Sequence, residues 1–344
     1  MDKMMIDYRT QKVRAPGLLG DFWFHSEPFA IADLQGQVVL LHFWDYASPG
    51  SLRSLAYVKS WHEKYGEYGL ITVGIHTPGF GFGKERSNLE EALERLAIRY
   101  PVIADNQSFI WTAYGNRIWP TFCLVDKEGF IRFSRSGEGA YDQIERMLQA
   151  LLTESGIHGE LPDFTPPLHD IDIPGILCYR ATGDIALGYL RGTIGNPEGF
   201  SPESTVKYED GEFLLPGRLY LKGKWHCGRE YVQFDGEQGE SGTAVVRYEA
   251  LEVNAVLAPE GAKPASLVLE QNGAVLPREI EGRDVRRQPD GSAEVLVDRP
   301  GVFHLVKNRE FGESVLTLST TSPSLQIYQI SFVTAPIPET VHKN

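Results

Sequence analysis

Two serines at the start of a predicted helix are the residues whose type and spacing first suggest a chemical site. Ser48 and Ser51 flank Pro49 and Gly50, directly after a strongly apolar segment. A helix start presents unpaired backbone N–H groups and the positive end of the helix dipole, which stabilise an anion. This environment can turn a thiol into a thiolate nucleophile, but a serine alkoxide is far too basic to form there near pH 7. Ser48 and Ser51 are therefore candidates for binding or for simple helix capping, since serine is a favoured N-cap residue.

The sequence around these serines predicts alternating strands and helices. Continuous apolar runs are typical of buried strands, and apolar residues three and four apart are typical of helices with one buried face. The predicted elements are a strand at 37–44, a helix at 51–65, a strand at 70–76, a helix opened by a capping box at 87–90, a hairpin over 120–126 and 130–135, and a helix at 141–153. This order indicates an α/β domain in which the Ser48 turn joins the first predicted strand to the first predicted helix.

The pattern changes after residue 155. Residues 156–175 contain four prolines and no sustained period, so we expect a linker there. Beyond it, short alternating runs separated by Gly, Pro, Asn and Asp predict an all-β sandwich or jelly roll. The predicted domains are an N-terminal tail at 1–12, an α/β domain at 13–155, the linker at 156–175, the β-sandwich at 176–335 and a C-terminal tail at 336–344.

Composition and charge exclude several classes of function. The 344 residues carry a formal net charge of -13 without a Lys- or Arg-rich run, so nucleic acid is not an expected partner. No stretch approaches the roughly 20 apolar residues of a membrane span. Residues 1–12 lack the basic and apolar regions of an export signal, so the sequence as written predicts a cytoplasmic protein. No residues show metal-ligand spacing, and we expect neither a metal nor a cofactor.

The three cysteines are too few for a disulfide scaffold. Cys123 lies in a predicted buried strand and is expected to be an inert thiol. A disulfide between Cys178 and Cys227 is left open, because it requires Cα atoms within about 7 Å.

Several segments resemble proteins of the thioredoxin superfamily. There, Phe-Trp precedes the redox motif Cys-X-X-Cys at a helix start, as Phe43-Trp44 precedes Ser48 here. The further segments that carry the resemblance are 61–65, 74–78, 98–102, 104–106, 114–120 and 137–141. They are similar to the redoxin (TlpA-like) module of the DipZ family, in which a β-sandwich of the carbohydrate-binding type follows. The resemblance implies a thioredoxin-like fold, the thiol:disulfide oxidoreductase lineage and, if the chain was trimmed, an extracytoplasmic location.

The resemblance also implies roles for particular residues. Ser48 stands in the place of the attacking cysteine, Ser51 in that of the resolving cysteine, and His42 where many relatives have a buried carboxylate that moves protons. Pro120 falls at the superfamily's cis-proline position, so Trp119–Pro120 is predicted to be a cis peptide that presents a backbone edge to a docked peptide. The implied substrate-binding residues are Trp44, Pro49, Gly50, Trp119 and Pro120.

Three functions remain open at this point. The first is a thioredoxin-like protein that is redox-silent as written and binds protein or peptide at the cis-proline edge. The second is an active thiol:disulfide oxidoreductase whose Cys-Pro-Gly-Cys cysteines were engineered to serine. The third is a glycan- or protein-binding module led by the β-sandwich. Its aromatic platform would be Tyr220, Trp225 and Tyr231, although such residues more often pack in a core.

The remaining polar candidates favour structural roles. His42 and His76 are expected to be core histidines, and the sequence shows no partner for His76. The glycine-rich segment 79–84 matches no phosphate-binding loop and predicts a flexible loop with two aromatic anchors near the site.

Overall fold

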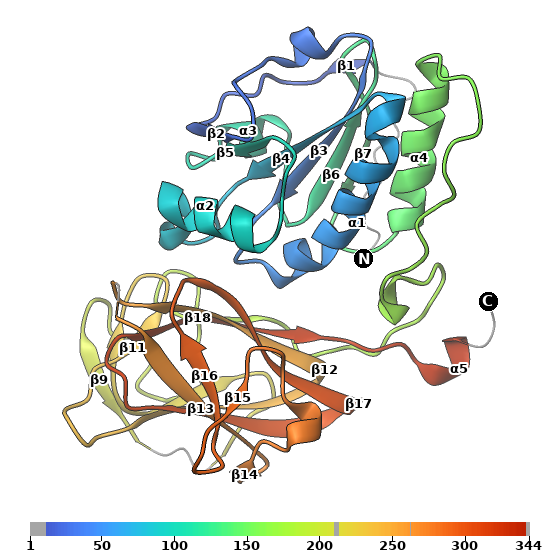
Figure 1. Ribbon diagram of the computed structural model, residues 1–344. Coiled ribbons are helices and arrows are strands. Elements are labelled where there is room, and N and C mark those ends of the chain that lie inside the picture. The colour runs from blue at the N-terminus through green and yellow to red at the C-terminus, as the bar shows by residue number, and fades with distance from the viewer. Residues whose placement is uncertain (1–11, 210–212, 262, 342–344) are drawn as a thin grey trace. The chain divides into compact units, whose positions relative to one another are not determined.

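The strand that leads to Ser48 lies in the middle of a seven-stranded mixed sheet (Figure 1). The structure is a computed structural model that describes residues 12–209, 213–261 and 263–341. Every residue of β3 (Val38–Trp44) is buried, as the continuous apolar run predicted. It pairs in parallel with β4 (Leu70–His76) and antiparallel with β6 (Thr121–Val125). The sheet order is β1-β7-β6-β3-β4-β5-β2.

The other elements of this unit surround that strand. They are β1 (Val13–Arg14), β2 (Phe22–Phe24), β5 (Val102–Ala104), β7 (Phe130–Ser136), α1 (Pro49–Tyr65), α2 (Arg86–Arg95), α3 (Phe109–Ala113) and α4 (Tyr141–Glu154). Successive side chains of β3 point to opposite faces of the sheet. Val39, Leu41 and Phe43 join a hydrophobic cluster that includes Ile110 of α3. His42 on the opposite face contacts α1 through Ser54.

The capping box predicted at the start of α2 is wrong. The helix begins at Arg86, so Ser87 lies inside its first turn, and its N-cap Glu85 makes no side-chain hydrogen bond. The reason is the preceding 3-10 helix, Gly81–Lys84, because only Glu85 separates its end from the start of α2. The amide of Leu89 donates to the carbonyl of Glu85, so helical hydrogen bonding starts earlier than the sequence pattern suggested.

The chain divides into two compact units, Met1–Gly175 and Ile176–Asn344. The predicted linker at 156–175 falls in the first unit, where several of its residues donate or accept hydrogen bonds with α1 and α4. The predicted tail at 1–12 lies outside the described residues except for Lys12. Within the predicted C-terminal tail, Pro338–Val341 form a short helix, α5.

The second unit is all-β, as predicted. Its strands are β8 (Ile185–Ala186), β9 (Thr205–Tyr208), β10 (Leu219–Cys227), β11 (Val232–Phe234), β12 (Gly242–Pro259), β13 (Ala265–Gln271), β14 (Ala274–Val275), β15 (Arg286–Arg287), β16 (Ala293–Val297), β17 (Gly301–Thr320) and β18 (Leu325–Val333). They join in one antiparallel hydrogen-bonded network around one hydrophobic cluster. The long strands β12 and β17 pair with each other across two irregularities in register. Such bulges bend a strand, which allows one continuous network to enclose a core.

Candidate functional site: the Ser48 turn and its supports

The Ser48 turn has one partly accessible serine and one fully buried serine. Ser48 is the N-cap of α1, and its hydroxyl oxygen accepts a 3.3 Å hydrogen bond from the amide of Ser51. Pro49 occupies the first helical position, where its missing N–H costs no hydrogen bond. Ser51 is 0% exposed, and its hydroxyl oxygen accepts from the amide of Asp45 at 3.2 Å. The turn therefore offers an accessible position at 48 and a protected one at 51.

Asp45 and His76 form a buried pair that sequence reasoning missed. Asp45 Oδ1 accepts from His76 Nε2 at 3.2 Å and from the Ala47 amide at 2.9 Å, and Oδ2 accepts from the Gly79 amide at 2.8 Å. The main chain of Asp45 also bonds to the amide of Ser48 and to Ser51. Asp45 thus ties the turn to the loop after β4. An acidic residue directly after a buried strand was the only sequence signal for this role.

His42 is a neutral core histidine. It is 0% exposed, and its Nε2 lies 3.0 Å from Ser54 Oγ. Since the Ser54 hydroxyl already donates to the carbonyl of Ser51, it accepts from His42, which places the ring proton on Nε2. His42 Nδ1 is buried without a partner. Burial lowers the pKa of His42 to about 3, so the ring does not reproduce the charge of a carboxylate at this position.

Replacement of His42 is expected to flatten the acid dependence of stability. The pKa of His42 is about 3 when folded and near 6.5 when unfolded, so the unfolded chain binds the proton first as pH falls. The folded state therefore loses stability below pH 6.5, by ~2 kcal/mol from this residue between pH 6.5 and 4.5. Urea denaturation at both pH values should show this loss in the parent chain and a correspondingly smaller one in His42→Phe. Equal losses in the two proteins would contradict the assignment.

The Trp119–Pro120 peptide is cis, which confirms the prediction. Trp119 is half-buried and its ring packs against Trp111 at 4.7 Å between centroids. A Cβ atom added at Gly79 would lie 3.6 Å from the Trp119 ring and 3.0 Å from Asp45 Oδ2, so the Gly79 and Trp119 loops meet beside the Asp45 pair. The structure thus brings the predicted cis-proline edge close to the support of the Ser48 turn.

Among the described residues, the amide and the carbonyl of Trp119 make no hydrogen bond. The neighbouring backbone is occupied: Ile118 O accepts from Thr121 Oγ1, and Pro120 O accepts from the Gly137 amide at 2.7 Å. Trp119 therefore has an open backbone donor and an open acceptor, meaning that neither has a partner among the described residues, and an added extended strand can pair with such groups.

Trp44 and the glycine-rich segment support the site from within. Trp44 is 0% exposed, so its side chain lies beneath the turn rather than on its surface. The predicted loop contains a regular turn, because residues 81–84 form a 3-10 helix with backbone hydrogen bonds within 80–85. The two aromatic anchors do lie near the site: Phe80 is 7% exposed, and the carbonyl of Phe82 accepts from Tyr46 OH at 3.3 Å.

An ion pair covers the other side of the turn. Arg53 donates to both carboxylate oxygens of Glu138 at 2.7 Å. The Glu138 carboxylate lies against Gly50, since a Cβ atom there would be 2.9 Å from Glu138 Oε2. Glycine at position 50 therefore permits this close approach. No pattern in the sequence indicates this contact, because the two residues are 85 positions apart.

None of the three cysteines forms a disulfide. Cys123 is 2% exposed, and burial raises the pKa of its thiol far above the usual range. Cys227 is buried with its sulfur 3.1 Å from Tyr208 OH, and Cys178 lies in a β-bridge opposite Pro336. The bridge that the sequence left open is therefore not formed, and the first unit has no accessible thiol among its described residues.

The aromatic residues proposed as a platform in the second unit are mainly internal. Trp225 is 0% exposed and Tyr220 is 7% exposed. Tyr231 is half-buried, with its ring 5.2 Å from that of Tyr328. The packing interpretation is therefore confirmed for Tyr220 and Trp225.

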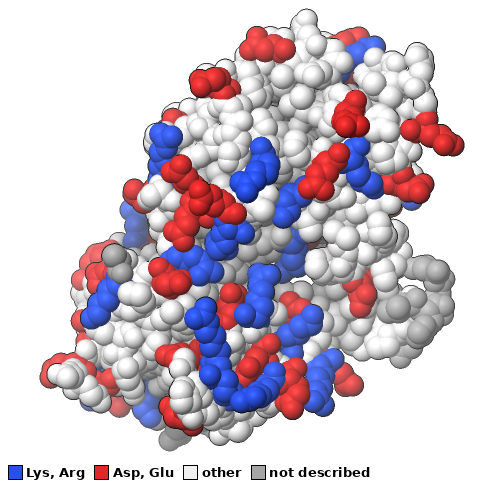
Figure 2. Space-filling view, viewed as in Figure 1, with Lys and Arg blue, Asp and Glu red and all other residues white. Residues whose placement is uncertain are grey.

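Basic and acidic side chains are interspersed on the face drawn in Figure 2. Within the described ranges, no group of three or more His, Cys, Asp or Glu residues is placed to hold a metal ion. None of the helices that the structure describes combines the length and apolar character that a membrane crossing requires.

Both units match known protein families. Residues 19–134 match the AhpC/TSA family, and residues 182–332 match the family described as "Thioredoxin like C-terminal domain". The chain thus has a thioredoxin-like α/β domain followed by a β-rich C-terminal domain of the kind found with such proteins. This confirms the fold class that the sequence predicted.

The chain is similar to protein DipZ. It is 29% identical to the DipZ proteins of Mycobacterium tuberculosis and Mycobacterium bovis over 268 residues, which cover 74% of this chain and 37% of those proteins. It is 25% identical to the thiol-disulfide oxidoreductase ResA of Geobacillus thermodenitrificans over 121 residues, 35% of this chain and 67% of ResA. A putative thiol:disulfide interchange protein DsbE from Chlorobium tepidum is 21% identical, with a TM-score of 0.36, over 41% of this chain and 96% of that one. The first unit is therefore thioredoxin-like and similar to thiol-disulfide oxidoreductases.

Proposed function

We propose that this protein is a redox-silent member of the thiol-disulfide oxidoreductase lineage that binds an extended polypeptide segment at the Trp119–Pro120 edge. The observation that carries the proposal is the open amide and carbonyl of Trp119 near a turn whose two serines are hydrogen-bonded. Backbone pairing supplies affinity without requiring a particular sequence, and the half-buried Trp119 ring adds apolar contact. Ser48 and Ser51 maintain the turn through hydrogen bonds and do not exchange electrons.

The parent chain is expected to lack disulfide reductase activity. Thiol–disulfide exchange needs a thiolate, and the only thiol in the described part of the first unit is the buried Cys123. Reduction of insulin with dithiothreitol as electron source should proceed at the background rate at every protein concentration. A rate that rises with the protein and disappears in Cys123→Ala would show that the buried thiol is reachable.

Binding at the edge is tested with reduced, carboxymethylated insulin B chain, an extended polypeptide without a reactive thiol. The fluorescence anisotropy of the labelled B chain should rise saturably as the concentration of the parent chain increases. Trp119→Ala should weaken the affinity by about tenfold or more, as expected for loss of a large aromatic contact. Leu296→Ala is the control, because Leu296 is an exposed apolar residue of the second unit. Equal losses in the two variants, or no binding by the parent, would refute the proposal.

The alternative is an active oxidoreductase whose two cysteines were exchanged for serine by engineering. Similarity to DipZ and ResA supports this alternative. The codons for positions 48 and 51 in the natural gene decide it: serine codons support the redox-silent protein, and cysteine codons support the engineered enzyme.

A further inference from the structure

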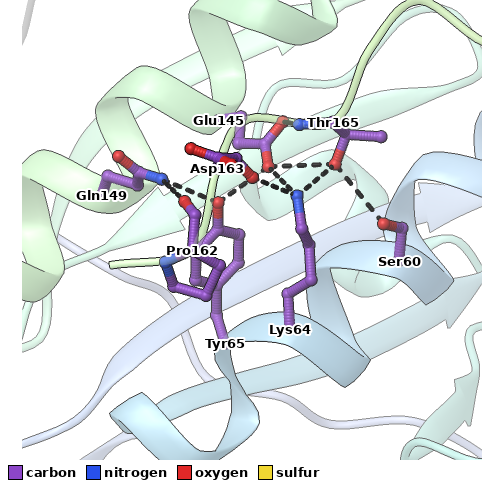
Figure 3. Close-up of polar contacts among 8 residues, drawn as sticks. All are labelled: Ser60, Lys64, Tyr65, Glu145, Gln149, Pro162, Asp163 and Thr165. Atoms are coloured by element: carbon purple, nitrogen blue, oxygen red, sulfur yellow. Dashed lines mark hydrogen bonds and ion pairs between the residues drawn. The ribbon is translucent and has the colours of Figure 1, made fainter. Parts of the chain in front are cut away.

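The segment after α4 is hydrogen-bonded to side chains of α4 and α1 at two places, which we call fastenings. Residues 162–172, which we call the strap, run back along α4 in the reverse direction (Figure 1) and also bond to α1. The first fastening is Glu145, which is 1% exposed and lies at the centre of the contacts in Figure 3. Its carboxylate accepts from the amide and hydroxyl of Thr165 at 2.8 and 3.0 Å, from Tyr65 OH at 2.7 Å and from Lys64 at 3.3 Å. The strap thus supplies two of the donors that stabilise a buried charge.

The second fastening is the hydroxyl of Tyr57, which lies nearer the Ser48 turn. This hydroxyl accepts from the Leu168 amide at 2.7 Å and donates to Asp172 Oδ2 at 2.8 Å. The Tyr57 side chain is 1% exposed, and its ring stacks on Tyr141 at 3.8 Å between centroids. One hydroxyl therefore holds both ends of the segment from 168 to 172.

A short series of contacts connects this fastening to the site. Tyr141, which stacks on Tyr57, follows Glu138 by three residues, and Glu138 packs against Gly50 in the Ser48 turn. Arg53, the partner of Glu138, lies one helical turn before Tyr57 on α1. Burial raises the pKa of Asp172, the hydrogen bond from Tyr57 lowers it, and the charges of Glu138 and Arg53 act on it in opposite directions.

We propose that the strap is a conformational latch for the Ser48 turn. Docked on Tyr57, it holds segment 137–141 and the start of α1 in place; released, it lets both move. The latch is a property of the unbound chain and does not depend on the proposed peptide binding. Its opening is a local unfolding event, the kind of motion that amide hydrogen exchange measures.

The test is hydrogen–deuterium exchange of the whole chain, measured by mass spectrometry, with the variant Tyr57→Phe. This change removes both latch hydrogen bonds and keeps the ring on Tyr141. Amides at 168–172 should exchange roughly tenfold faster or more, as expected for loss of two hydrogen bonds. Amides at 48, 50–53 and 137–141 should also exchange faster, while those of β6 and β12 stay unchanged.

The matched control is Tyr100→Phe, which also removes a buried tyrosine hydroxyl, but one without a hydrogen-bond partner. It should leave exchange unchanged in all five of these segments. Faster exchange of the strap alone would overturn the latch and leave a passive fastening. A uniform increase that includes β6 would also overturn it, because the effect would then be general destabilisation. No change in the strap would show that Tyr57 does not hold it.

Discussion

The variant Ser48→Cys with Ser51→Cys is expected to reduce insulin at a rate proportional to its concentration, where the parent chain shows only background. The position of Ser48 at the N-cap of α1 places a sulfur beside unpaired amides and the positive end of the helix dipole. The single variant Ser48→Cys should consequently be alkylated at pH 6 roughly tenfold faster than an unperturbed thiol, because a lowered pKa leaves more thiolate. The negative charge of Glu138, which lies against Gly50, disfavours a thiolate at position 48. The ion pair of Glu138 with Arg53 reduces this unfavourable influence.

The second half of the redox cycle is expected to recover less well. A cysteine at position 51 would be buried, and the nearby His42 donates its ring proton to Ser54. Burial lowers the pKa of His42 to about 3, so His42 supplies no negative charge to accept the proton of the resolving thiol. Mixed disulfides should therefore accumulate during turnover of the double variant. If Ser48→Cys is alkylated no faster than an unperturbed thiol, the turn lacks the electrostatic property assigned to it.

Asp45→Ala is expected to lower the free energy of unfolding by ~3–5 kcal/mol and to abolish polypeptide binding. The truncation leaves the amides of Ala47 and Gly79 and the Nε2–H of His76 without their acceptor in a buried position. Each such loss costs about 1–3 kcal/mol. Urea denaturation measures the first effect, and the anisotropy of labelled carboxymethylated B chain measures the second.

Two controls define what the Asp45 result means. Asp45→Asn keeps one carbonyl oxygen and should lose less stability than Asp45→Ala. Asp33→Ala removes an exposed carboxylate that also accepts from one backbone amide, and it should cost under about 1 kcal/mol. A loss for Asp45→Ala no greater than for Asp33→Ala would show that Asp45 does not support the turn.

The parts of the site that lie close together in sequence could be predicted. The apolar run of β3, the proline at the first position of α1 and the capping serine are local signals, and all act within residues 38–51. The cis peptide at Trp119–Pro120 was predicted from the superfamily resemblance and is confirmed. These features depend on neighbouring residues or on a motif.

The supports of the site could not be predicted, because they depend on where distant loops meet. The Asp45–His76 contact joins residues 31 apart, and the Arg53–Glu138 pair joins residues 85 apart. Neither spacing follows from helix or strand periodicity. The same holds for the strap. Its proline-rich composition predicted a linker, whereas its contacts depend on a glutamate of α4 and a tyrosine of α1, which lie earlier in the sequence.

The most direct test of the account is an NMR titration of the isotope-labelled parent chain with reduced, carboxymethylated insulin B chain. The open amide and carbonyl of Trp119 predict that the amide resonances of Trp119, of residues 46–48, 50 and 51, and of Gly79 and Phe80 shift together and saturably, without any covalent adduct. Shifts confined to residues of the second unit, or no shifts at a concentration that saturates the anisotropy signal, would contradict the claim that the cis-proline edge binds polypeptide.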